Sequence, residues 1–228
     1  MLKEFIKTGE EARRALLGTI IADGSLCKAR KGGAYKNKCY LEITHTSKNL
    51  DYLKEIKGVL QDILGISCNI TEHNKKTTEK AYSLYRLCTE STSSLKLLRD
   101  QLYDKNRVKL FPKHIIDCFT DLSLLLLYFD DGTLKVRYYE GTSKLREARV
   151  TFCLDSFTYD EMKYFQKFLL RNYEIKTGIY RHSKNMELNR GFRLWTNTEN
   201  TRKFMNIIDK YYECVPSMKY KFLKYYSL

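Results

Sequence analysis

Two short apolar runs each end in an acid followed by glycine, and these acids are the residues best suited to chemistry. The first run, Leu16–Ala22, precedes Asp23 and Gly24, and the second, Leu124–Asp130, precedes Asp131 and Gly132. The aspartates before the glycines are 108 positions apart, close to half of the 228-residue chain. An acid at the C-terminal end of a helix is unfavourable because the helix dipole places partial negative charge there. Two such acids at matched points therefore indicate a function.

The chemistry open to this pair is cation binding. If the two helices pack side by side, Asp23 and Asp131 approach each other, and protons or divalent cations must relieve their repulsion. Carboxylate oxygens suit Mg²⁺, and a paired acidic cation site suits phosphodiester hydrolysis. The plainer interpretation is that each Asp-Gly pair ends a helix and starts a hairpin. Glycine at that point is expected to form a left-handed C-terminal cap. Two copies at equivalent places favour the metal site.

The charge of the chain favours a polyanionic partner. Forty-one Lys and Arg against 27 Asp and Glu leave a net charge of +14, spread along the whole sequence. Basic side chains that neutralise phosphates release counterions, so nucleic acid is favoured over a charge that only aids solubility. No segment approaches the roughly 20 apolar residues that span a membrane, and a membrane partner is not expected.

The seven cysteines indicate a reducing environment. Their number is odd and no two form a Cys-x-x-Cys pair, which disfavours both a disulfide framework and a zinc site. The first residues are too polar for a secretory signal. We expect an organelle matrix (mitochondrion or chloroplast) or a bacterial cytoplasm, and not secretion.

The elements that must position the acids occur twice along the chain. Capping boxes at Thr8–Glu11 and Thr158–Glu161 each open a helix. Hydrophobic periodicity predicts helices over 8–23, 48–64, 94–103, 122–131, 158–172 and 198–211, and strands around 26 and over 40–44, 66–72, 81–89, 134–139, 148–154, 174–181 and 192–196.

Specific residues recur at nearly the same spacing. Ser47 and Ser156 precede the middle helices of the two halves and are 109 apart, as are His73 and His182 at strand ends. This spacing predicts a domain-sized duplication with an N-terminal half 1–110 and a C-terminal half 111–228. The fold class is α+β, with two αββαββα halves that each carry an antiparallel sheet. Because one chain contains both halves, we expect a monomer.

The paired runs resemble the signature of the LAGLIDADG homing endonucleases, particularly the single-chain members with two pseudo-symmetric halves. The resemblance covers nearly the whole chain. The second copy is looser, with Leu126 in place of Gly18 and Asp130 in place of Ala22. Its Asp-Asp-Gly ending, and the segment Pro216–Lys221, are similar to a yeast mitochondrial intron-encoded subgroup. The resemblance implies that the signature helices join the halves into a DNA-binding saddle.

The resemblance also implies roles for individual residues. Asp23 and Asp131 would be the catalytic, metal-binding acids, with the carbonyls of Ala22 and Asp130 as further ligands. The side chain of Asp130 stands at the helix-packing position, which gives it a structural or supporting role. Lys109 and Lys221 would each lie near a scissile phosphate, where they would stabilise charge in the transition state or help to position water.

DNA recognition would fall to the strands, whose concave face enters the major groove, where all four base pairs can be distinguished. Half of the candidates are expected to touch only phosphates. His73 and His182 are expected to face the groove or be structural, and Trp195 to lie in the core. The candidate readers are Lys28, Arg30, Lys36, Lys38, Arg86, Lys135, Arg137, Tyr139, Arg146, Arg149, Arg181 and Arg193.

The function expected from these features is Mg²⁺-dependent double-strand cleavage of a long, asymmetric DNA site, with Mn²⁺ as a substitute metal. An intron-encoded or free-standing enzyme fits the chain. Two alternatives remain open on the same fold. One is a maturase that binds intron RNA and assists splicing, and the other is a DNA-binding regulator with weak or no cleavage.

Overall fold

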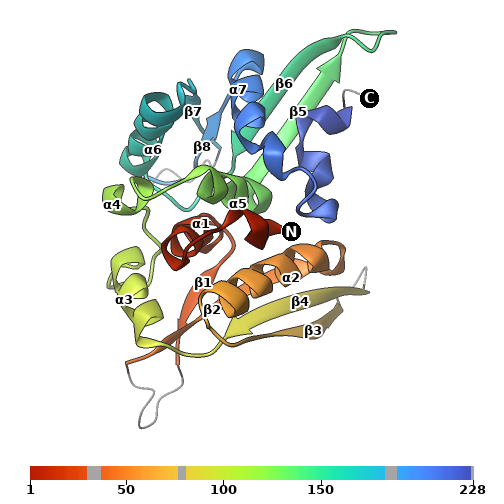
Figure 1. Cartoon of the computed structure of the whole chain (residues 1–228). Coiled ribbons are helices and arrows are strands. Elements are labelled where there is room, and N and C mark those ends of the chain that lie inside the picture. Colours follow the sequence, from red (N-terminus) through yellow and green to blue (C-terminus); the bar gives the residue numbers. More distant parts are fainter. Residues whose placement is uncertain (30–36, 77–80, 183–188, 227–228) are drawn as a thin grey trace.

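Two four-stranded antiparallel sheets organise the chain (Figure 1). The computed structural model describes residues 1–29, 37–76, 81–182 and 189–226, with only the backbone at 74–76 and 81–82. The first sheet has the order β1-β2-β4-β3 and the second β5-β6-β8-β7. The matching order confirms two antiparallel sheets of one topology. The strands are β1 (Ser25–Lys28), β2 (Cys39–Thr46), β3 (Cys68–Lys76), β4 (Ala81–Thr89), β5 (Gly132–Tyr138), β6 (Leu145–Phe152), β7 (Gly178–Arg181) and β8 (Phe192–Trp195).

Two helices, α1 (Gly9–Ile21) and α5 (Asp121–Asp131), lie side by side at the centre of the molecule, between the sheets (Figure 1). The remaining helices cover the sheets or follow them: α2 (Leu50–Gly58), α3 (Ser93–Leu102), α6 (Tyr159–Tyr173) and α7 (Thr198–Ile208). The periodicity did not predict α4 (Lys113–Ile116) or the short 3-10 turns η7 (Pro216–Lys221) and η8 (Leu223–Tyr226). Among the described residues, no helix is both long enough and apolar enough to cross a membrane.

Side chains open the helices where the sequence indicated. The Thr8 hydroxyl accepts from the Glu11 amide at 3.1 Å, and the Glu11 carboxylate accepts from the Thr8 amide at 3.3 Å. Thr158 and Glu161 form the same reciprocal pair. Both capping boxes are confirmed. A third, between Thr120 and Ser123, opens α5, so all three satisfy amides that the first helical turn leaves free.

The two central helices approach closely at Gly18. A Cβ at this position would overlap the Ser123 carbonyl oxygen and lie 2.8 Å from the Leu127 amide nitrogen of α5. The Ser123 hydroxyl crosses the interface and donates to the Arg14 carbonyl at 2.8 Å. Any side chain larger than hydrogen would therefore force the backbones apart, so Gly18 allows the close helix contact.

The glycines after the acids do not form the expected left-handed caps. Gly132 is extended, with φ −92° and ψ 149°, and Gly24 is not among the described residues with positive φ. They are needed for space instead, because a Cβ on Gly24 would lie 2.9 Å from the Ile20 Cα and one on Gly132 would overlap Tyr128. The cap prediction was therefore wrong, and close packing explains both glycines.

Two further expectations differ from the structure. Strand β7 begins at Gly178 and not at Glu174, because Glu174 takes a left-handed conformation and the Lys176 amide donates to the side chain of buried Asn200. Trp195 is only half buried. It lies on the sheet face away from the helices, with the Arg149 guanidinium 4.5 Å above its ring, so it is not a core residue.

Candidate metal and DNA site

Asp23, His45 and Asp130 meet where α1 and α5 end. One ligand atom from each lies within 4.8 Å of the others. His45 Nε2 is 3.3 Å from Asp130 Oδ1 and 3.9 Å from Asp23 Oδ2. The Asp130 side chain is fully buried and the His45 side chain 8% exposed, whereas that of Asp23 is 41% exposed. The cluster therefore has a buried base and an open carboxylate.

A network of buried hydroxyl groups holds the Asp130 carboxylate in place. The Thr19 hydroxyl donates to Asp130 Oδ2 and also bonds the buried Tyr52 hydroxyl at 2.6 Å. Asp130 thus occupies the packing position, as the sequence indicated, and at the same time presents its carboxylate to the cluster. Because Thr19 and Tyr52 fix one carboxylate oxygen, the other faces His45 and Asp23 in a defined orientation.

The second acid, Asp131, lies outside this cluster, but burial and the charges of the cluster both raise its pKa. Burial, and after it the charges of Asp23 and Asp130, raise the pKa of Asp131 to about 7. Burial and the Asp130 charge likewise raise the pKa of Asp23. Burial lowers the pKa of His45, but the Asp130 carboxylate outweighs it and the net shift is upward. These directions show mutual repulsion among the three acids.

This donor set fits a divalent cation. His45 Nε2 and Asp130 Oδ1 are buried and have no well-aligned hydrogen-bond partner among the described residues. Unpaired buried polar atoms are costly, and a cation near Asp23 would satisfy the carboxylate. Hard cations such as Mg²⁺ prefer oxygen to imidazole. The carboxylates are therefore the candidate ligands, and His45 lies where it can position Asp130.

Two lysines close the C-terminal ends of the central helices. Lys109 Nζ donates to the carbonyls of Ile20, Ala22 and Gly24 at 2.9, 2.9 and 2.6 Å. Lys221 Nζ donates to those of Tyr128, Phe129 and Gly132. Each ammonium neutralises the negative end of its helix dipole, which offsets the unfavourable placement of the neighbouring acid.

Burial changes the titration of both lysines. It lowers the pKa of Lys109 to about 8 although the neighbouring acids oppose the shift, and it lowers the pKa of Lys221 against the same opposition. All three donors of each ammonium have backbone acceptors within reach. The carbonyl of Ala22 accepts from Lys109 and keeps a second lone pair, and its role as a ligand stays a prediction.

Cations collect on the face of the second sheet that points away from the helices. Lys135 of β5 stands directly opposite Arg149 of β6. Like charges at paired positions are unfavourable unless a polyanion lies over them. Glu147 forms ion pairs with Arg149 at 3.0 Å and with Arg137 at 3.4 Å, so one carboxylate contacts both guanidinium groups. This face has the chemistry of a phosphate-binding surface.

The other candidate DNA contacts are more scattered. Arg86 lies on the matching face of the first sheet, 3.5 Å from Glu42. Arg193 forms a two-pronged ion pair with Asp155, so its guanidinium is already engaged. Arg30 and Lys36 lie outside the described residues. Lys28, Tyr139, Arg146 and Arg181 are exposed at strand ends and Lys38 is half buried beside one.

The sequence interpretation missed His45, Thr19 and Tyr52. It considered His73 and His182, which are both exposed and lie outside the metal-capable cluster. One signal was available, because an alternating strand pattern places His45 on the same face as the apolar Leu41 and Ile43. A histidine on a buried strand face needs a polar partner, and that requirement indicates an acid nearby.

Known proteins resemble this chain in sequence and in fold. The chain is 25% identical over 219 residues to the cytochrome b mRNA maturase bI2 of Saccharomyces cerevisiae, a match that covers 92% of this chain and 47% of the maturase. The chain thus spans about half the length of this relative. The homing endonuclease I-WcaI bound to its DNA recognition sequence has a similar fold, with a TM-score of 0.73, 18% identity, and coverage of 97% of this chain and 90% of that chain.

A second solved structure agrees on the fold. I-DmoI in complex with DNA and Mn matches with a TM-score of 0.51 and 18% identity, over 89% of this chain and 96% of that chain. The profile of the LAGLIDADG DNA endonuclease family matches residues 13–204, which include both signature helices and both sheets. The chain belongs to the LAGLIDADG DNA endonuclease family.

Proposed function

We propose that this chain is a site-specific DNA endonuclease that makes a double-strand break with Mg²⁺. The observation that carries the proposal is the convergence of Asp23, Asp130 and Asp131 at the ends of two packed helices in a chain of net charge +14. Family membership supports a nuclease, and I-WcaI, a structural neighbour, is described as bound to DNA.

The protein groups divide the work. Asp23 and Asp131, with Asp130, hold the cation, and the carbonyls of Ala22 and Asp130 add neutral oxygens. When bound, Mg²⁺ supplies activation of water and stabilisation of the leaving oxygen. His45, Thr19 and Tyr52 keep Asp130 in one orientation. Lys109 and Lys221 hold the helix ends in place beside the acids.

The sheets supply the grip on DNA. Lys135, Arg137 and Arg149 contact the backbone or bases in one half of the target, and Arg86 acts in the other half. Because the two faces carry different side chains, the preferred target is asymmetric. A single chain contains both signature helices, so we propose that it acts as a monomer.

Cleavage of the intron-free target is the direct test. The rejoined DNA that flanks the reading frame is incubated with the purified protein in Mg²⁺ and, separately, in Ca²⁺. We expect a double-strand break at the junction with Mg²⁺ and binding without a break with Ca²⁺. Binding without cleavage in Mg²⁺ and Mn²⁺ would leave a DNA-binding regulator as the function.

A maturase activity is the second candidate, and the similarity to an mRNA maturase favours it. The prediction is specific binding of the intron transcript in a filter-binding assay, with faster splicing of that transcript. A protein that binds the transcript and leaves the rejoined DNA uncut would be a maturase alone. One that does both would be bifunctional, since DNA cleavage and RNA binding are scored separately.

A further inference from the structure

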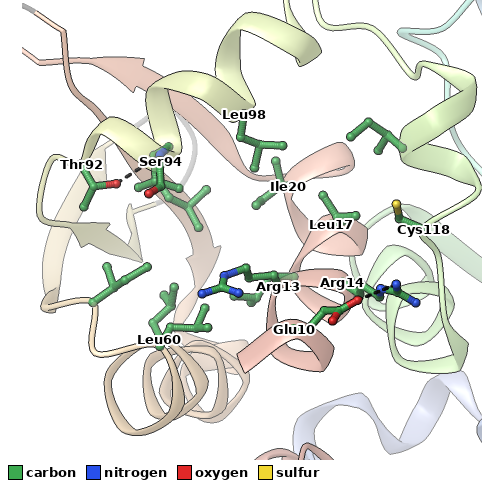
Figure 2. A pocket seen from close by; sticks show the side chains of 16 residues that line it. Glu10, Arg13, Arg14, Leu17, Ile20, Leu60, Thr92, Ser94, Leu98 and Cys118 are labelled. Carbon is green, nitrogen blue, oxygen red and sulfur yellow. Dashed lines mark hydrogen bonds and ion pairs between the residues drawn. The ribbon is translucent and has the colours of Figure 1, made fainter. Parts of the chain in front are cut away.

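A pocket of about 430 Å³ opens along one side of α1 (Figure 2), and neither Asp23 nor Asp131 lines it. Its walls come from α1, from the helical segment Val59–Ile63 that directly follows α2, from the start of α3 and from α4. Most of the lining is aliphatic, including Leu17, Ile20, Leu60 and Leu98. Pockets of this size and character bind small organic molecules.

The second half of the chain shows what fills the equivalent space. By the signature spacing Ile20 corresponds to Tyr128, and by the spacing of the middle helices Leu64 corresponds to Tyr173. Leu98 and Phe204 each lie four residues before the end of α3 and α7. Three aliphatic pocket residues therefore stand where the second half has aromatic rings.

Each of those rings packs against another aromatic ring of the second half. The ring centroids of Tyr128 and Phe204 are 5.1 Å apart, and Phe168 and Tyr173 are 5.9 Å apart. Phe204 is fully buried, whereas Leu98 is only half buried. The first half thus lacks the aromatic side chains that fill the second half, and the pocket lies beside the smaller side chains that replace them.

A cation stands at the mouth of this pocket. Figure 2 shows the Arg13 side chain extending from α1 into the pocket towards Leu60. No ion pair or hydrogen bond joins the Arg13 guanidinium to another described residue, whereas Arg14 is held by Glu10 at 2.6 Å. The residue that corresponds to Arg13 is Asp121, which Lys210 binds at 2.8 Å. In the second half the charge of Asp121 is therefore paired, whereas in the first half the charge of Arg13 has no protein partner among the described residues.

We infer that this pocket binds a small organic anion with an aromatic body. The body takes the place of the rings that Tyr128, Tyr173 and Phe204 supply in the second half, and the anionic group pairs with Arg13. The volume is nearly three times that of the cavity of about 150 Å³ that accommodates benzene in an engineered protein. Two fused rings and a substituent therefore fit.

The test uses two fluorescent probes that differ by one charge. Anilinonaphthalene sulfonate is an aromatic anion, and N-phenylnaphthylamine is its neutral counterpart. Both are titrated into the full chain without DNA. We expect saturable binding of about one sulfonate per protein. Arg13→Ala should weaken the binding of the sulfonate by about 10-fold or more, the scale of a charged hydrogen bond. The same substitution should change the affinity for the neutral probe by less than about 2-fold.

Filling the pocket should exclude both probes. Leu98→Phe and Leu64→Tyr restore the rings of the second half and should each weaken binding by about 10-fold or more. Leu97→Phe, on the exposed side of α3, and Lys54→Ala, on the exposed side of α2, are the matched controls and should bind as the parent chain does. Circular dichroism verifies that each variant is folded. Both Leu98→Phe and Leu64→Tyr are used, so that the test still stands if one of them does not fold.

Three results would overturn the inference. They are the absence of saturable binding to the parent chain, unchanged binding in folded Leu98→Phe and Leu64→Tyr, and equal loss of both probes in Arg13→Ala. DNA cleavage is measured on the same samples. Because the pocket excludes the signature acids, cleavage that persists while probe binding fails counts against the pocket alone.

Discussion

His45 of the first sheet faces Asp130 of α5, with 3.3 Å between Nε2 and Oδ1. The pair joins the two halves of the chain at the buried end of the central helices. It has no equivalent on the other side of the pseudo-symmetry axis, where the corresponding residues are Leu154 and Ala22. The environments of Asp23 and Asp131 therefore differ.

This pairing predicts a coupling that can be measured. His45→Leu should destabilise the metal-free protein by about 1–3 kcal/mol, because it leaves a buried carboxylate without its partner. Adding Asp130→Ala to His45→Leu reproduces the corresponding residues Leu154 and Ala22, and should recover part of the lost free energy of unfolding. A double-mutant cycle by urea unfolding tests this, with an expected coupling of about 0.5–3 kcal/mol. Strictly additive effects would show that the two side chains do not interact.

The lysine caps predict a loss of stability. Lys221→Met retains the length of the side chain but leaves the carbonyls of Tyr128, Phe129 and Gly132 without their donor, and should cost about 1–3 kcal/mol. Lys224→Met, exposed three residues later, is the control and should cost less than about 0.5 kcal/mol. If Lys221→Met slows cleavage without destabilising the fold, the lysine acts on the phosphate and not on the helix.

The acid cluster predicts how stability depends on pH. The pKa of Asp131 is raised to about 7, so between about pH 4 and 7 the folded protein binds more protons than the unfolded chain. The free energy of unfolding that the Asp131 carboxyl contributes is therefore fully present below about pH 4 and is lost as the pH rises towards 7. Thermal unfolding in EDTA from pH 5 to 8 should show this fall, and Asp131→Asn should flatten it.

The same cluster predicts a metal effect of opposite sign. Cations compete with protons for the carboxylates, so the rise in Tm on adding Mg²⁺ or Ca²⁺ should be larger at pH 8 than at pH 5. Asp131→Asn should reduce the rise. A shift in Tm that is equal at both pH values, and equal in Asp131→Asn, would place metal binding elsewhere.

The paired cations on the second sheet predict the salt dependence of DNA binding. Affinity should fall steeply with salt, by about 0.9 in log-log slope for each phosphate contact. Arg149→Ala and Lys135→Ala should each reduce the slope by about 1. Lys163→Ala, on the outer side of α6, serves as the control. A flat salt dependence would mean that these side chains do not contact phosphates.

Much of the fold could be predicted from the sequence because the duplication repeated each signal. The capping box at Thr8 and the alternating pattern of β2 follow local rules, and the structure has both. Local rules could not place His45 beside Asp130, since 85 residues separate them along the chain. The same applies to Lys109, whose carbonyl acceptors lie at and just after the end of α1, from Ile20 to Gly24. Tertiary packing fixes both relationships.

Cleavage by Asp23→Asn and Asp131→Asn tests the central claim most directly. Each variant is assayed with Mg²⁺ on a duplex labelled on both strands, and DNA affinity is measured in parallel with Ca²⁺. Asp100→Asn, on the exposed side of α3, is the control. Both variants should keep the DNA affinity within about 3-fold and lose double-strand cleavage by about 1000-fold, the loss that follows from about 4 kcal/mol of transition-state stabilisation. Full double-strand cleavage by either variant would contradict the account.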